Sequence, residues 1–271
     1  MFKCAKYAEA NGRILYIDTE RSGFLDSFDN YFTSLSPTIH LGKLDFLSPP
    51  FDVFPSCLSF DITTYQSKKR ANNIYRHSLT NIPLTFDFSK SYAEQILVHE
   101  HSEGGEPAVD MLEKLKLKEN IRQYIEQIIS GLGEYDAIHI RNTDFKTDYK
   151  KFFSEINDRL GARVVVCTDD LECQTYAKSF FGKRLSIVAD IPDTRGKTLH
   201  CNKDIDRFHT NLITLCDLFV LACGQNLYFT HIEPDKHYSM TLGRAYLSGF
   251  SRLANALHQR PSLIQRLLYD K

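Results

Sequence analysis

The stretch AIHIRNTDF, Ala137 to Phe145, decides how this chain folds, because an apolar run ends there in a histidine, an arginine and an aspartate. Side chains alternate between the two faces of a strand, so His139 and Arg141 point one way while Ile138 and Ile140 point the other. The stretch therefore predicts a buried strand with two basic side chains on one face of its carboxyl end.

Strands and helices alternate around this strand, which predicts a parallel sheet covered on both faces. The predicted helices of the second half lie at 114–132, 149–160, 171–181, 209–216, 251–258 and 261–268. The predicted strands lie at 135–141, 163–169, 184–188, 217–223 and 226–232.

The first half is less regular. We predict a helix at 2–10 and strands at 13–19, 58–65 and 95–100. A chain that opens on a helix followed by such a strand predicts a βαβ unit whose first strand is missing. The basic segment SKKRANNIYRH (67–77) is predicted to be a solvated loop, with acceptor binding as the alternative. We expect an N-terminal lobe at 1–112 and a C-terminal lobe at 113–271.

Composition excludes several partner classes. The 271 residues are 42% hydrophobic and 25% charged with a net charge of -1, which gives no electrostatic reason to expect nucleic acid or a membrane surface. No apolar run is long enough to span a bilayer, and charges interrupt the N-terminus as they would not in a signal peptide. Seven cysteines without CxxC spacing predict reduced thiols and a cytoplasmic protein.

Ligands of open parallel sheets bind beyond the carboxyl ends of the strands. The strand at 135–141 presents His139, Arg141 and Asp144 there. An arginine at such a place can hold an anion with two parallel hydrogen bonds. The alternative is an internal ion pair of Arg141 with Asp144 or Asp169.

Two further segments belong to the same edge. Thr168, Asp169 and Asp170 follow the strand at 163–169, and they either line the site or cap the helix at 171–181. The stretch SGFSRLA, from Ser248, offers hydroxyls, a glycine and a helix N-terminus, which together suit a phosphate. The three segments together predict a phosphorylated ligand, most simply a nucleotide.

Other motifs predict no chemistry. His99 and His101 in HEH invite a metal, but no third ligand stands at a suitable spacing, so we expect no metal site. HSEGGEP lacks the lysine of a phosphate-binding P-loop, and no GxSxG nucleophile motif occurs.

In their order, HIRNTD, VVVCTDD and SGFSRLA resemble the motif set of the fucosyltransferase superfamily, which includes α1,6-, α1,2-, protein O- and nodulation fucosyltransferases. The stretch at 9–32 resembles the first lobe of that superfamily. The resemblance implies a GT-B architecture, that is, two Rossmann-like lobes with parallel sheets and a cleft between them. It also implies GDP-fucose as donor, a glycan hydroxyl as acceptor, inversion, and neither metal nor cofactor.

The resemblance assigns roles to individual residues. It implies that Arg141 holds the diphosphate, that His139 lies beside the nucleotide and that Asp144 holds the motif loop. It places Asp148 where a carboxylate base is found. The donor-binding set that it implies is His139, Arg141, Thr168, Asp169, Asp170, Ser248, Gly249, Phe250 and Ser251. Fixed donors suit the chemistry, because a departing diphosphate carries negative charge.

The chain departs from the superfamily pattern at several points. Asn142 stands in place of a second arginine and Phe145 in place of a lysine, and Asp206 and His209 stand where an acidic residue is common. The segment 224–247 separates the last predicted core strand from SGFS, and the first strand of the N-terminal lobe is missing. These departures leave two alternatives open: a transferase with another nucleotide sugar, and a non-catalytic glycan- or nucleotide-binding relative. The sequence does not determine the oligomeric state.

Overall fold

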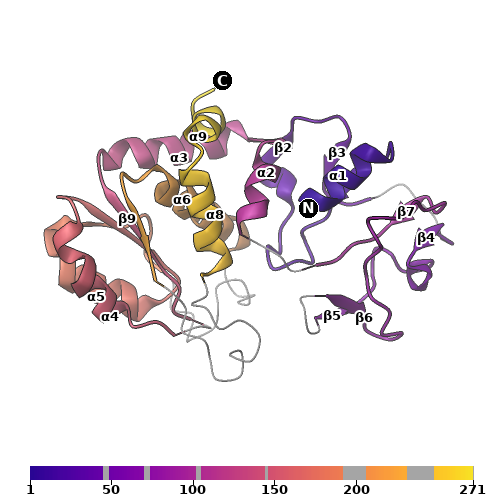
Figure 1. Cartoon of the computed structure of the whole chain (residues 1–271), viewed down its shortest axis with the longest axis horizontal. Coiled ribbons are helices and arrows are strands. Elements are labelled where there is room, and N and C mark those ends of the chain that lie inside the picture. Colours follow the sequence, from indigo (N-terminus) through magenta and orange to yellow (C-terminus); the bar gives the residue numbers. More distant parts are fainter. Residues whose placement is uncertain are drawn as a thin grey trace.

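The structure is a computed structural model that describes residues 1–44, 49–69, 74–101, 105–143, 146–191, 206–230 and 247–270. Figure 1 shows two lobes side by side, with α8 and α9 standing between the sheet around β9 and the elements of the N-terminal lobe. The α-helices are α1 Phe2–Ala10, α2 Val109–Leu112, α3 Glu119–Leu132, α4 Tyr149–Ile156, α5 Leu171–Phe181, α6 Arg207–Cys223, α8 Gly249–His258 and α9 Pro261–Leu268. Short 3-10 turns include Phe28–Asn30, Ser56–Leu58 and Glu106–Ala108.

The C-terminal lobe is built on a parallel sheet in the order β11-β10-β9-β12. Its strands are β9 Asp136–Ile140, β10 Val164–Thr168, β11 Leu185–Ser186 and β12 Leu227–Phe229. All residues of the two central strands are buried, as expected for a parallel sheet with both faces covered. The order is that of a doubly wound sheet, whose carboxyl edge is the usual place for a ligand.

The two faces of this sheet belong to different cores. Ala137 and Cys167 pack on the face covered by α3, α6, α8 and α9. Ile138 and Ile140 pack on the other face, against α4 and α5. This alternation is the one predicted from AIHIRNTDF, and it sends the side chain of His139 toward α8.

The N-terminal lobe has only two-stranded pairs among the residues described. Its strands are β1 Leu15–Ile17, β2 Phe32–Ser34, β3 Ile39–Leu41, β4 Val53–Phe54, β5 Ser67–Lys69, β6 Tyr75–His77 and β7 Ile96–Leu97. The pairs β1–β3 and β4–β7 are parallel, and β5–β6 is antiparallel. Strand β8 (Leu115–Leu117) lies beyond residue 112 but pairs antiparallel with β2.

Core packing continues across residue 112. The largest buried cluster joins Ala5, Ile17 and Phe32 to side chains of α3, α6 and α9. At its edge the Phe208 ring of α6 stacks on Tyr31, with ring centroids 5.2 Å apart. The boundary between 112 and 113 stays a prediction.

Four predictions are wrong. Ser67–Lys69 and Tyr75–His77, predicted to be parts of a solvated loop, form the antiparallel pair β5–β6. The helix predicted at 114–132 begins at Glu119, because Leu115 and Leu117 are buried on β8 and only the later residues keep a helical apolar stripe. The strand predicted at 217–223 is the end of α6, since a short apolar run fits a buried helix as well as a buried strand. The strand predicted at 58–65 forms turns after a 3-10 helix. The helices at 2–10, 171–181 and 261–268 are confirmed at their predicted bounds.

Candidate functional site at the carboxyl edge

The carboxyl ends of β9 and β10 lie side by side, because the two strands pair in parallel register up to Ile140 and Thr168. Arg141 follows β9 and Asp169 follows β10. Their side chains form an ion pair with 2.6 Å between Arg141 Nη1 and Asp169 Oδ2. The ion pair that the sequence left open as an alternative is therefore present. The arginine side chain remains 23% exposed, against 11% for the aspartate, so the pair lies at the surface of the sheet edge.

Asp169 also holds the loop that follows β9. Its Oδ1 accepts the backbone N–H of Asn142 at 2.9 Å, and its Oδ2 accepts the hydroxyl of Thr143 at 2.5 Å. One carboxylate thus holds three consecutive residues of HIRNT. This arrangement fixes where the guanidinium of Arg141 points, because the backbone on which it stands cannot shift without breaking these bonds.

Asn142 is a structural residue that sequence reasoning missed. It is buried, its amide donates to Asp170 Oδ2 at 2.8 Å, and its Oδ1 accepts the backbone N–H of Thr147 at 2.9 Å. The side chain therefore ties the motif loop to the end of β10. The available signal was chemical: an asparagine after a strand often bonds a nearby backbone N–H.

Thr168 and Asp170 form hydrogen bonds with backbone N–H groups of the residues that follow them. Asp170 Oδ1 accepts the backbone N–H of Cys173 at 2.9 Å and caps α5, as the capping alternative predicted. The Thr168 hydroxyl lies 3.3 Å from the backbone nitrogen of Asp170, and the residue is buried. Of the three residues in TDD, Asp169 forms an ion pair with Arg141.

The N-terminus of α8 approaches the same edge. Ser248 caps the helix, since its Oγ accepts the backbone N–H of Ser251 at 2.9 Å. The backbone N–H of Arg252 bonds to Ser248 O, as a helix requires. Within the part of the chain that the structure describes, no hydrogen bond uses the N–H groups of Gly249 and Phe250. These two N–H groups point out of the first turn, where a helix attracts an anion.

His139 joins β9 to this helix. Its Nδ1 lies 2.7 Å from Ser251 Oγ, and its ring packs on Phe250 with centroids 5.1 Å apart. Burial lowers the pKa of His139 to about 4, with the charge of Asp169 opposing the shift and that of Arg141 adding to it. The imidazole is therefore neutral at physiological pH. It lies close enough to Arg141 and Asp169 to feel both charges.

The two predicted carboxylates beyond β9 differ. Asp144 lies outside the described residues. Asp148 is exposed and caps α4, accepting the backbone N–H of Lys151 at 3.0 Å. An open hollow of about 440 Å³ beside it is lined by Lys146, Thr147, Asp148, Tyr149 and Lys150.

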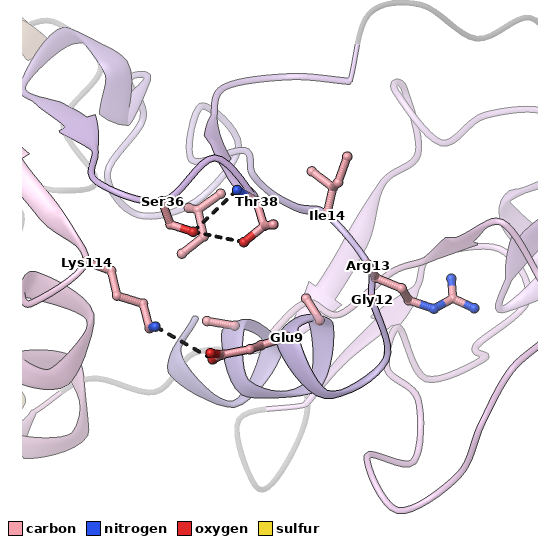
Figure 2. A pocket seen from close by; sticks show the side chains of 10 residues that line it. Glu9, Gly12, Arg13, Ile14, Ser36, Thr38 and Lys114 are labelled. Carbon is pink, nitrogen blue, oxygen red and sulfur yellow. Dashed lines mark hydrogen bonds and ion pairs between the residues drawn. The ribbon is translucent and has the colours of Figure 1, made fainter.

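A second hollow, of about 310 Å³, lies elsewhere in the molecule (Figure 2). It lies at the amino ends of β1 and β3, beside Ile14 and Thr38. The ion pair of Glu9 and Lys114 lies across it, with 3.8 Å between the two groups. Since the amino ends of strands lie opposite the ligand edge, this hollow is not part of the candidate site.

The two histidines of HEH lie side by side. The rings of His99 and His101 stack with centroids 5.7 Å apart, and His99 Nδ1 lies 2.6 Å from the hydroxyl of Thr85. Among the residues described, no three His, Cys, Asp or Glu side chains gather as metal ligands would. Nor does any helix within those ranges have the length and apolarity to cross a membrane.

Comparison with known proteins gives a structural likeness only. No protein-family model matches the chain, and a search of curated proteins finds no significant match. Among solved structures, fucosyltransferase NodZ from Bradyrhizobium is similar at TM-score 0.57 and 16% identity, over 93% of this chain and 85% of that one. NodZ α-1,6-fucosyltransferase co-crystallized with GDP is similar at TM-score 0.57, and the same enzyme soaked with GDP-fucose at 0.54, each over 94% of this chain at 16% identity. The predicted architecture is confirmed: this chain has a GT-B-like fold of the fucosyltransferase type.

Proposed function

We propose that this protein is a glycosyltransferase that moves fucose from GDP-fucose to a glycan hydroxyl. The observation that carries the proposal is that Arg141 follows β9 at the carboxyl edge of a GT-B-like lobe, and that the first turn of α8 is held against the same strand through the contact of His139 with Ser251. In the solved relatives of the same fold, the bound molecules are GDP and GDP-fucose.

The chemistry of transfer requires a site for a leaving diphosphate. When the bond between the sugar and the diphosphate breaks, its electron pair moves to a phosphate oxygen. In this proposal Arg141 and the N–H groups of Gly249 and Phe250 stabilise that charge. Donors fixed in advance act strongly, and the loss of one costs about 3 kcal/mol of transition-state stabilisation.

Asp169 has a supporting role here. Its carboxylate would repel a diphosphate by itself, but the guanidinium of Arg141 balances its charge and two further donors bond to it. The pair therefore orients one edge of the guanidinium. Arginine suits such a place because its planar group stays charged at any physiological pH.

The proposal also covers the binding and reaction of the glycan acceptor. The N-terminal lobe (1–112) would hold the glycan, and its hydroxyl would attack the anomeric carbon from the side opposite the diphosphate, with inversion. Asp144 and Asp148 remain the proposed carboxylates for the proton of that hydroxyl. Asp148 would have to give up its bond to Lys151 to act. No metal is required in this scheme.

The proposed location is the cytoplasm. Cys167, Cys173 and Cys216 are buried thiols without disulfide partners, a state that a reducing compartment maintains. Burial raises the pKa of each of these thiols, so they are poor nucleophiles.

A thermal-shift panel tests the donor. GDP should stabilise the protein, by about 2.7 kcal/mol at 100 times its dissociation constant, whereas UDP, ADP and CMP should not. EDTA should leave the GDP shift unchanged. Equal shifts with GDP and UDP would favour another nucleotide sugar, and no shift with any nucleotide would contradict the proposal. Binding of GDP without transfer from GDP-fucose would indicate the non-catalytic alternative.

A further inference from the structure

Three buried side chains link β9 to the start of α8, and we call them the clasp: His139, Ser248 and Ser251. Ser251 Oγ lies 2.7 Å from His139 Nδ1 and 2.8 Å from Ser248 Oγ. Ser248 Oγ in turn accepts the backbone N–H of Ser251. The exposed fractions are 6% for His139, 7% for Ser248 and 2% for Ser251, so the network lies inside the protein.

The hydroxyls of Ser248 and Ser251, which the sequence analysis assigned to phosphate binding, form hydrogen bonds within the clasp. Each serine oxygen already contacts a partner within 2.9 Å, and both residues are buried. What the first turn of α8 offers to a ligand is instead backbone: the N–H groups of Gly249 and Phe250. The serines therefore determine where those N–H groups stand.

We propose that His139 is a positioning residue: through Ser251 and Ser248 it holds the first turn of α8, so that the N–H groups of Gly249 and Phe250 meet the diphosphate of the donor. This inference rests on the proposed function. It changes the expected roles of His139, Ser248 and Ser251 from contacts with the nucleotide to support of the backbone that contacts it.

The surroundings of His139 agree with a neutral support. Phe250 covers one side of the ring and Ser251 bonds to it, both from α8, while the nearby charges are Asp169 after β10 and Arg141 after β9. The low pKa that burial gives His139 leaves it uncharged above about pH 5. A direct ionic contact between this imidazole and a phosphate would need the opposite shift.

Calorimetric titration with GDP-fucose tests the clasp. Ser251→Ala removes the hydroxyl that meets His139 and leaves the backbone N–H that Ser248 caps. We expect its affinity to fall about five- to tenfold, the loss of roughly one well-placed hydrogen bond. His139→Leu should cause a similar loss, and the double variant should lose little more than either single one, because both changes break the same contact.

A conservative variant separates positioning from bulk. In His139→Asn the amide reaches the place of Nδ1, so the contact to Ser251 can form again and affinity should recover to within about twofold of the wild type. The matched control is Ile156→Val, a buried change at the far end of α4. It should lower the melting temperature through a loss of about 0.5–1.5 kcal/mol and leave GDP-fucose affinity unchanged.

The pH profile gives an independent result. GDP-fucose has no phosphate that titrates between pH 5.5 and 8, so its affinity should be flat there if His139 is neutral. A drop in affinity above pH 6.5, or unchanged affinity in Ser251→Ala and His139→Leu, would overturn the positioning role while leaving the donor assignment intact. A wild type that fails to bind GDP-fucose would refute the proposed function and this inference with it.

Discussion

The two lobes differ in how their strands are held. In the C-terminal lobe, β9 and β10 are buried along their whole length, and neighbours on both sides pair with β9. In the described part of the N-terminal lobe every strand belongs to a pair of two or three residues per strand, and His77 is the buried residue of β6. The difference teaches that the site residues stand on the lobe with the fully buried central strands, where packing on both sheet faces would resist a displacement of Arg141.

Side-chain bonds join distant segments of the N-terminal lobe. Arg13 donates to the carbonyl oxygens of Tyr92, Glu94 and Gln95 at 2.6, 2.9 and 3.2 Å, and so joins the α1–β1 turn to a distant segment. The Tyr7 hydroxyl donates to Lys90 O at 2.9 Å. Arg13 thus holds segments of the N-terminal lobe together, whereas Arg141 belongs to the candidate site of the C-terminal lobe.

We expect the largest effect from replacing Arg141, with Arg13 as the comparison. Arg141→Ala should lower the rate of transfer from GDP-fucose at least about 100-fold, because a preorganised donor to the diphosphate is lost. Its stability should fall by only about 1–2 kcal/mol, since the ion pair is partly exposed and Asp169 keeps two other donors. Transfer assays and denaturant unfolding measure the two quantities.

Arg13→Ala is the matched variant in the other lobe. It should destabilise the protein while leaving the GDP thermal shift unchanged, because its guanidinium bonds to carbonyl groups far from the carboxyl edge of the C-terminal sheet. A normally active Arg141→Ala protein would rule out the diphosphate role of Arg141.

The next largest effect is expected on stability, at the close contact of Gly224 with β9. A Cβ on Gly224 would stand 2.7 Å from the Cβ of Ala137 on β9, closer than such atoms approach. Gly224→Ala should therefore force β9 and the end of α6 apart and reduce the free energy of unfolding by about 1–3 kcal/mol. Urea unfolding checks this, and an unchanged midpoint would show that the C-terminal sheet yields more easily than its packing implies.

Two titrating groups in the C-terminal lobe, the partly buried Asp217 and the buried His139, should act in opposite directions. Burial raises the pKa of Asp217 to about 7, so this carboxyl favours the folded state at low pH and loses that contribution as pH rises from about 4 to 7. The lowered pKa of His139 does the reverse, because its contribution is lost as pH falls from 6.5 toward 4.

Replacing Asp217 should reveal the pH dependence of stability that His139 contributes. Asp217→Asn should become more stable as pH rises from 4.5 to 6.5, by up to about 1.4 kcal/mol per pH unit, while the wild type changes less. Melting temperatures across this range measure the slopes. Parallel curves for the two proteins would mean that Asp217 titrates as an exposed carboxyl does.

The smallest effect is expected in the N-terminal lobe. Gly23 has no atom within 4 Å of the place where a Cβ would stand, so Gly23→Ala should change stability by less than about 0.5 kcal/mol. The same space surrounds Gly131 in α3, where alanine should add up to about 1 kcal/mol through helix propensity. A large loss in Gly23→Ala would show that the N-terminal lobe packs more tightly than its short strands suggest.

The sequence alone predicted several helices and the alternation of side chains along β9. The sequence predicted α1, α5 and α9 at their observed bounds, because helix formation depends largely on residues that are close together in the chain. The alternation of Ile138, His139 and Ile140 predicted which side chains face which core, since strand geometry has a period of two. The order of the strand ends also predicted which segments form the candidate site.

Tertiary structure decided what the sequence left open. Residues 217–223 became helix because α6 is buried on most sides, and Leu115–Leu117 became a strand because β2 pairs with it. Arg141 took Asp169 as its partner through the register of β9 and β10, and Ser251 turned to His139 through the packing of α8. A hydroxyl or a carboxylate can cap, pair or bind, and only the neighbours brought near by the fold determine which of these it does.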